Sequence, residues 1–125
     1  MKFARMVYRI AAVYGLITLP PLYFMSGRIA SQAPPAITHL EFYFGFIGLA
    51  LLWQLVFLLI ATNPVLYRAL MPVTILEKFI YSVPVLILYL TGRTGAMILL
   101  PALADPIFGV LFIAAYIRTP GLPRA

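Results

Sequence analysis

An aspartate inside an apolar segment is the residue of this sequence with the clearest chemical potential. Asp105 lies in LLPALADPIFGVLF, residues 99–112, and is followed directly by a proline. It falls about ten residues into an apolar run, so a rise of about 1.5 Å per residue brings it near the middle of a bilayer. An aspartate there costs about 2.5–3.5 kcal/mol on insertion scales, so we expect its carboxyl group to face the bundle interior or water.

The residues around Asp105 favour a position between helices. Pro101, Asp105 and Gly109 are each four residues apart and form a compact stripe that permits close helix contact. Pro101 and Pro106 also leave carbonyl groups one turn earlier without their usual amide donors. Asp105 is therefore tolerated if it is protonated, or if a cation or an amide reaches it.

Other polar residues of the apolar runs can reach the level of Asp105. Gln54 lies in the apolar run 42–62, Lys78 and Tyr81 lie in the run 73–91, and Arg9 lies in the run 6–25. Together with Asp105, these residues would place a polar group from each of the four apolar runs in the cytoplasmic half of the helix bundle. Two interpretations stay open: the groups hold the helices together, or they form a proton or ligand site.

The segment TILEK, residues 74–78, also has two interpretations. In the first, which we favour, Thr74 caps the third helix and Glu77 closes a capping box, while Lys78 extends toward the lipid headgroups. In the second, the helix continues back through Pro72. That continuation would bury Glu77 and Lys78 as an internal ion pair packed against the apolar run 96–117.

Capping also explains the polar residues at two other helix ends. Thr38 and Glu41 begin and end THLE, which matches a Thr-x-x-Glu capping box at the start of the second run. Asn63 precedes a proline and takes the place of an N-cap in the second connection. The single histidine, His39, and the lack of cysteine leave too few ligands for a metal site, so we predict neither a metal nor a cofactor.

The composition indicates that lipid, rather than water, surrounds most of this chain. Of its 125 residues, 64% are hydrophobic and 10% are charged, whereas soluble domains carry about 25% charged residues. Four apolar runs have the length of about 20 residues that spans a bilayer; they cover 6–25, 42–62, 73–91 and 96–117. We predict a single all-α domain over residues 1–125, a polytopic membrane protein built as a bundle of four transmembrane helices.

Basic residues gather at one end of the predicted bundle. That end holds Lys2, Arg5, Arg9, Arg68, Arg118 and Arg124. The opposite end holds only Arg28 and Arg93. Because cytoplasmic flanks carry the excess of basic residues, we predict that both termini face the cytoplasm from an inner (plasma) membrane. The scattered charges form no continuous basic face, so the net charge of +6 does not indicate nucleic acid binding.

The first run has an alternative interpretation as a secretory signal peptide. Basic residues and an apolar core precede IASQA, and cleavage there would leave three spans. Tyr8, Tyr14 and the pair Pro20–Pro21 are atypical of such a signal. Four spans therefore stay the prediction.

Three stretches of the chain carry a resemblance to known proteins. They are EFYFGFIGLALLWQLVFLLIATNPVLYRALMPVTILEK, LYLTGR and DPIFGVLFIAAY. Taken together they resemble a group of small bacterial inner-membrane proteins, similar in general shape to DoxX-like and other four-span families. The resemblance covers about residues 38–119 and rests on hydropathy and a few polar positions. It implies a bacterial origin and four spans, and it supplies no catalytic residue.

Three classes of function fit these observations. We predict a small non-enzymatic protein, either an accessory subunit of a membrane complex or a bundle that binds lipid or another hydrophobic ligand. Its partners would be the lipid bilayer, and other membrane subunits or further copies of itself. The alternative is a small proton-coupled secondary transporter that uses Asp105. A lipid-modifying enzyme is the third class, with Asp105 and Glu77 as acid and base.

Overall fold

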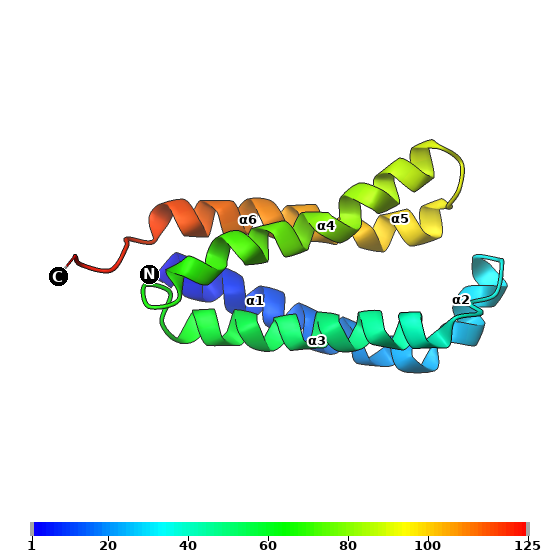
Figure 1. Cartoon of the computed structure of the whole chain (residues 1–125), viewed down its shortest axis with the longest axis horizontal. Helices are drawn as coiled ribbons and strands as arrows, with labels where there is room; N and C mark the ends of the chain where they lie inside the picture. The colour runs from blue at the N-terminus through cyan, green and yellow to red at the C-terminus, as the bar shows by residue number, and fades with distance from the viewer. Residues whose placement is uncertain (1, 125) are drawn as a thin grey trace.

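The computed structural model describes residues 2–124, and within this range the regular elements are all helical (Figure 1). In chain order they are α1 (Lys2–Thr18), the 3-10 helix η1 (Pro20–Phe24), α2 (Ser26–Gln32), α3 (Leu40–Thr62), the 3-10 helix η2 (Arg68–Leu70), α4 (Met71–Leu90), α5 (Ala96–Ala102) and α6 (Ala104–Arg118). The prediction of an all-α fold is confirmed.

Four helical stretches are long and apolar enough to cross a membrane. They cover Lys2–Phe24, Leu40–Thr62, Arg68–Leu90 and Ala96–Arg118, and each has 23 residues. Their mean hydropathies run from 1.2 to 2.4, and a length of about 20 residues suffices for a bilayer. The protein is thus a multi-pass membrane protein with a bundle of four transmembrane helices.

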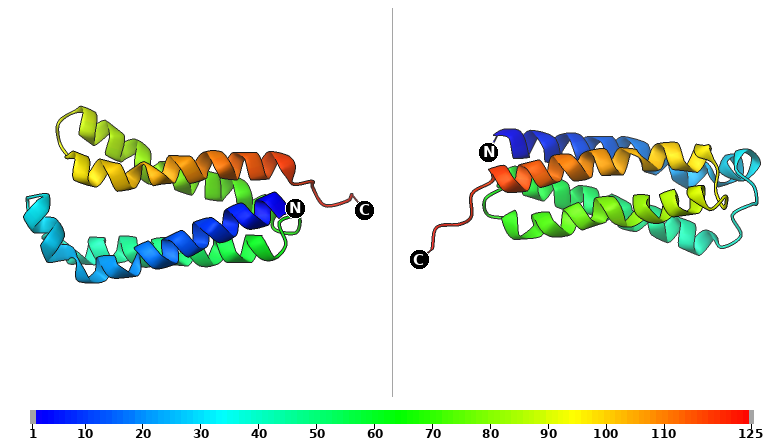
Figure 2. Two further views of the ribbon diagram at one scale, coloured as in Figure 1. Left: turned by 180° about the vertical axis from the view of Figure 1, so that it is seen from behind. Right: turned by 90° about the horizontal axis from the view of Figure 1, so that it is seen from above.

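The bundle consists of two helical hairpins. α1 packs along α3, and α4 packs along α5 and α6. The hairpins meet mainly through α1 and α6, whereas α3 and α4 have few contacts with each other. Figures 1 and 2 show that the hairpins lie close together near the two termini and diverge toward α2 and the α4–α5 loop. As a result, α3 and α4 pack on each other far less closely than the two helices of each hairpin.

An aromatic core holds the hairpins together near the termini. Tyr8 of α1 stacks on Phe112 of α6 with ring centroids 4.2 Å apart, and Phe57 of α3 packs edge-on against Phe112 at 5.1 Å. The Tyr8 and Thr74 hydroxyl groups form a buried hydrogen bond of 2.7 Å between α1 and α4. Each of these residues is fully buried, so side chains from all four spans meet at this point.

Proline and glycine residues set the ends and breaks of the second hairpin. Gly92 ends α4 with a φ of 74°, and the amide of Arg93 donates to the carbonyl of Leu88 at 2.8 Å, as in a Schellman cap. The fourth span is divided into α5 and α6 at Leu103. Pro106 lacks the N–H that would continue the helix across this point, which explains the break.

Candidate functional site

A buried lysine with two carboxyl groups lies where α4 packs on α6. The Nζ atom of Lys78 is 3.5 Å from Oε2 of Glu77 and 3.6 Å from Oδ1 of Asp105. We call these three residues the lysine–carboxylate cluster. Lys78 and Asp105 lie near the middle of the spans Arg68–Leu90 and Ala96–Arg118. Asp105 therefore has the cation that its position requires.

Aromatic rings enclose the ammonium group of Lys78 on its other sides. Its Nζ atom is 4.9 Å from the ring centroid of Phe57, 5.7 Å from that of Phe108 and 6.0 Å from that of Phe112. A cation within about 6 Å of an aromatic face is attracted by the ring quadrupole, and more strongly where water is excluded. Only 5% of Lys78 is exposed, so carboxylates and rings replace its hydration shell.

Gly109 allows α4 and α6 to approach closely enough to form the cluster. A Cβ atom at this position would lie 2.6 Å from Cε2 of Phe79 and 3.3 Å from Cβ of Lys78. Of the predicted stripe, Asp105 and Gly109 thus face α4, whereas Pro101 lies in α5 and is exposed. The same close packing that buries Gly109 brings Asp105 to Lys78.

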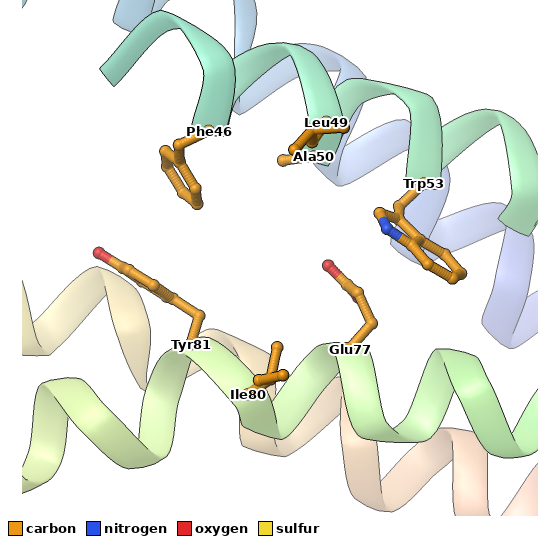
Figure 3. A pocket seen from close by; sticks show the side chains of 7 residues that line it. All are labelled: Phe46, Leu49, Ala50, Trp53, Glu77, Ile80 and Tyr81. Carbon is orange, nitrogen blue, oxygen red and sulfur yellow. The ribbon is translucent and has the colours of Figure 1, made fainter. Parts of the chain in front are cut away.

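A groove lies beside the cluster, between α3 and α4. It has a volume of about 290 Å³, and its lining consists of Phe46, Leu49, Ala50, Trp53, Glu77, Ile80 and Tyr81. We call it the α3–α4 groove. Figure 3 shows the Phe46, Ala50 and Trp53 side chains on one wall and Glu77 and Tyr81 extending from the other. Glu77 is the one acidic group of this lining.

Glu77 belongs both to the cluster and to the groove. Its side chain is 17% exposed, and its Oε2 atom is buried with no hydrogen-bond partner among the described residues. The 3.5 Å separation from Lys78 is longer than the 2.7–2.9 Å or so of a charge-assisted N–H···O bond. Because Oε2 is buried beside Lys78, a ligand in the groove can reach only the exposed remainder of this carboxyl group.

The structure supports the second interpretation of TILEK. Thr74 lies inside α4, is fully buried and donates to the carbonyl of Met71 at 2.7 Å, while the N-cap of α4 is Leu70. The predicted Thr74 cap is therefore wrong. The helix begins before Pro72 because proline is accepted in a first turn, where its missing N–H has no partner to lose. Glu77 and Lys78 are consequently buried together.

The other predicted caps have mixed outcomes. The N-cap of α3 is His39 without a side-chain cap, so the predicted box of Thr38 and Glu41 does not form; Glu41 instead lies 3.3 Å from the His39 ring. Both side chains are exposed, and water can satisfy the amides there. Asn63 does cap a turn, since its Oδ1 accepts from the amide of Leu66 at 3.2 Å.

Two predicted members of the polar cluster lie elsewhere. Arg9 is exposed, because the buried face of α1 passes through Tyr8 and Ala12 and leaves residue 9 on the opposite side. Gln54 is buried against α1, where its Nε2 donates to the carbonyl of Ala50 at 2.9 Å. A Cβ atom at Gly15 would overlap the Gln54 amide, so this glycine makes room for it.

The aromatic wall of the groove was missed by reasoning from the sequence. Phe46, Ala50 and Trp53 follow the spacing i, i+4, i+7 and so share one face of α3. Glu77 and Tyr81 are four residues apart on α4 and face them. The spacing was visible in the sequence, but the pairing of these two faces was not, because it depends on contacts between distant segments.

Arg68 has a structural role at the end of the bundle near the termini. Its Nε donates to the carbonyl of Thr119 at 2.7 Å, and its guanidinium lies 4.0 Å from the ring centroid of Tyr116. A cation at the C-terminal end of α6 is favourable for the helix dipole. This contact ties the α3–α4 connection to the end of α6.

Comparison with protein-family models, with curated proteins and with solved structures gives no match for this chain. Among residues 2–124, no group of three or more histidine, cysteine, aspartate or glutamate side chains could hold a metal ion. The site contains one ammonium group, two carboxyl groups and aromatic rings. Such a set can neutralise charge, bind a cation or accept hydrogen bonds.

Proposed function

We propose that this protein is a non-enzymatic membrane protein that binds an amphipathic or hydrophobic ligand in the α3–α4 groove. The α3–α4 groove carries the proposal, because it combines aromatic and aliphatic walls with one carboxylate. Ligand pockets are mostly apolar concavities with a few convergent polar groups that fix orientation. This groove has that composition.

The ligand would enter from the bilayer. Leu49 and Ile80 on the two sides of the groove are 65% and 73% exposed, and they lie well inside their membrane spans. At this depth the surroundings are acyl chains, so a lipid or another membrane-dissolved molecule can reach the groove without crossing water. We also propose a bacterial inner membrane as the location, with both termini cytoplasmic, following the basic residues and the resemblance to small four-span bacterial proteins.

Photo-crosslinking tests the proposed groove. A lipid with a diazirine in its acyl chain should label wild type at α3 and α4 residues of the groove. Ala50→Phe should reduce this labelling several-fold, because the new ring occupies groove volume. Leu52→Phe is the matched control, since Leu52 lies on the same helix outside the groove lining and is 58% exposed. Equal labelling of the two variants would contradict the proposal.

The accessory-subunit alternative has a different outcome in the same preparation. Purification in a mild detergent at native expression would then recover a second membrane protein in fixed stoichiometry. A single protein that retains lipid supports the binding function.

A further inference from the structure

We propose that the ligand of the α3–α4 groove has an ammonium head group, held by Glu77 against the ring of Trp53 and beside the stacked pair of Phe46 and Tyr81. The inference rests on the proposed binding function and names the chemical class of its ligand. An amphiphile of this class has one cationic amine end and one alkyl tail.

The charges of the cluster leave a place for a second cation. One ammonium group, that of Lys78, serves the carboxylates of both Glu77 and Asp105. With all three groups ionised the formal charge is −1, in surroundings where an uncompensated charge is expensive. The Lys78 ammonium group lies 3.5 Å from one carboxylate and 3.6 Å from the other. It therefore forms a close charge-assisted hydrogen bond with neither of them. A cation at Glu77 would balance the charge.

The groove reaches Glu77 and does not include Asp105. In Figure 3 the Glu77 carboxyl group extends from α4 toward α3, in the space between Trp53 and Tyr81. A ligand in the groove therefore meets this carboxylate and no other. The lining contains no lysine or arginine, so it has no group that would favour an anionic head group.

Aromatic rings supply the second half of an ammonium site. Phe46 of α3 and Tyr81 of α4 are stacked with centroids 5.2 Å apart and 28° between the ring planes. Trp53 lies on the same face of α3, seven residues further along. Aromatic faces beside a carboxylate attract alkylated ammonium groups, with tryptophan the most favourable ring.

The size of the groove fits a head group better than a whole lipid. Its volume of about 290 Å³ lies just below the range of ligand pockets, roughly 300–1,000 Å³. The ammonium group and its first methylenes would fill it. The remaining tail would lie along the exposed side chains of Leu49 and Ile80, among the acyl chains.

Three photoactivatable probes with the same alkyl chain test the inference: one with a trimethylammonium, one with a hydroxyl and one with a sulfonate head group. The full chain is placed in phosphatidylglycerol nanodiscs, which contain no competing amine, and labelled residues are identified by mass spectrometry. We expect the trimethylammonium probe to label the groove about tenfold more than the hydroxyl probe. The sulfonate probe should label it least.

Glu77→Gln is the diagnostic variant, and Glu41→Gln is its control. Glu77→Gln should lower labelling by the trimethylammonium probe about tenfold and leave hydroxyl-probe labelling unchanged, since only the charge is removed. Glu41 is exposed at the start of α3 and outside the groove, so Glu41→Gln should change neither. If Glu77→Gln does not fold, Trp53→Leu takes its place; it should lower labelling by the trimethylammonium probe several-fold more than labelling by the hydroxyl probe, because only the cation loses the attraction of the ring.

The outcomes separate the two levels of the proposal. Equal labelling by the trimethylammonium and hydroxyl probes, unchanged in Glu77→Gln or Trp53→Leu, would overturn the ammonium inference and leave a groove for apolar chains. Labelling that avoids the groove with every probe would overturn the binding function itself.

Discussion

Lys78 connects the stability of the bundle to its candidate site, because the same ammonium group contacts α6, the aromatic core and the edge of the groove. Its contacts with Glu77, Asp105 and Phe57 join residues of three helices. A buried ion pair often adds little net stability, but removing one partner leaves an uncompensated charge. Lys78 is therefore the residue at which a substitution should cost most.

We expect Lys78→Met to lower the free energy of unfolding by about 3–5 kcal/mol, because two buried carboxylates lose their cation. The measurement is reversible unfolding in detergent. The triple variant Lys78→Met, Glu77→Gln, Asp105→Asn should recover part of the loss, since it removes the charges together. A single Lys78→Met variant as stable as wild type would show that the cluster does not carry these charges.

Asp105→Asn separates an assembly role from proton-coupled transport. The asparagine keeps a side-chain oxygen that can accept from Lys78, and Lys78 keeps Glu77, so we expect a folded protein that behaves like wild type in cells. Asp105→Leu should be less stable, because Lys78 then loses an acceptor. Proton-dependent flux in proteoliposomes is the second readout. Flux in wild type that disappears in a stable Asp105→Asn variant would establish the transport alternative and contradict an assembly role.

At the scale of helices, sequence reasoning succeeded where the signal is local. The four apolar runs and the positions of Asp105 and Gly109 between helices were predicted, because each depends on residues within a few turns. The predictions for Thr74 and Arg9 were wrong, because they depend on how far a helix extends and which face it buries. Those outcomes require the packing of distant segments.

Close packing of α4 on α6 gives a test at this scale. Gly109→Ala should destabilise the protein by about 1–3 kcal/mol, because its Cβ would lie 2.6 Å from the Phe79 ring. Gly45→Ala is the control, since a Cβ there meets nothing within 4 Å. That substitution in α3 should be neutral or stabilising by up to about 1 kcal/mol. The measurement is thermal unfolding of both variants in detergent. Equal midpoints would mean that α4 and α6 lie further apart than in the structure.

For the whole molecule, the distribution of basic residues predicts the orientation in the membrane. Single cysteine substitutions can report which side of the membrane a position faces, because the chain has no cysteine of its own. Ser31 in α2 and Gly121 beyond α6 are exposed at opposite ends of the bundle. With cytoplasmic termini, a membrane-impermeant maleimide on intact cells should label Ser31→Cys, and should label Gly121→Cys only after permeabilisation. The reverse pattern would show that the termini do not face the cytoplasm and would contradict the predicted orientation.

The proposed ligand site lies between α3 and α4, where the two hairpins diverge. Native mass spectrometry of the protein released from a mild detergent tests that claim most directly. We expect wild type and Leu52→Phe to carry one bound amphiphile per chain, and Ala50→Phe, with its groove filled, to carry none. A bare wild-type chain, or an Ala50→Phe variant that retains the amphiphile, would contradict a ligand site between α3 and α4.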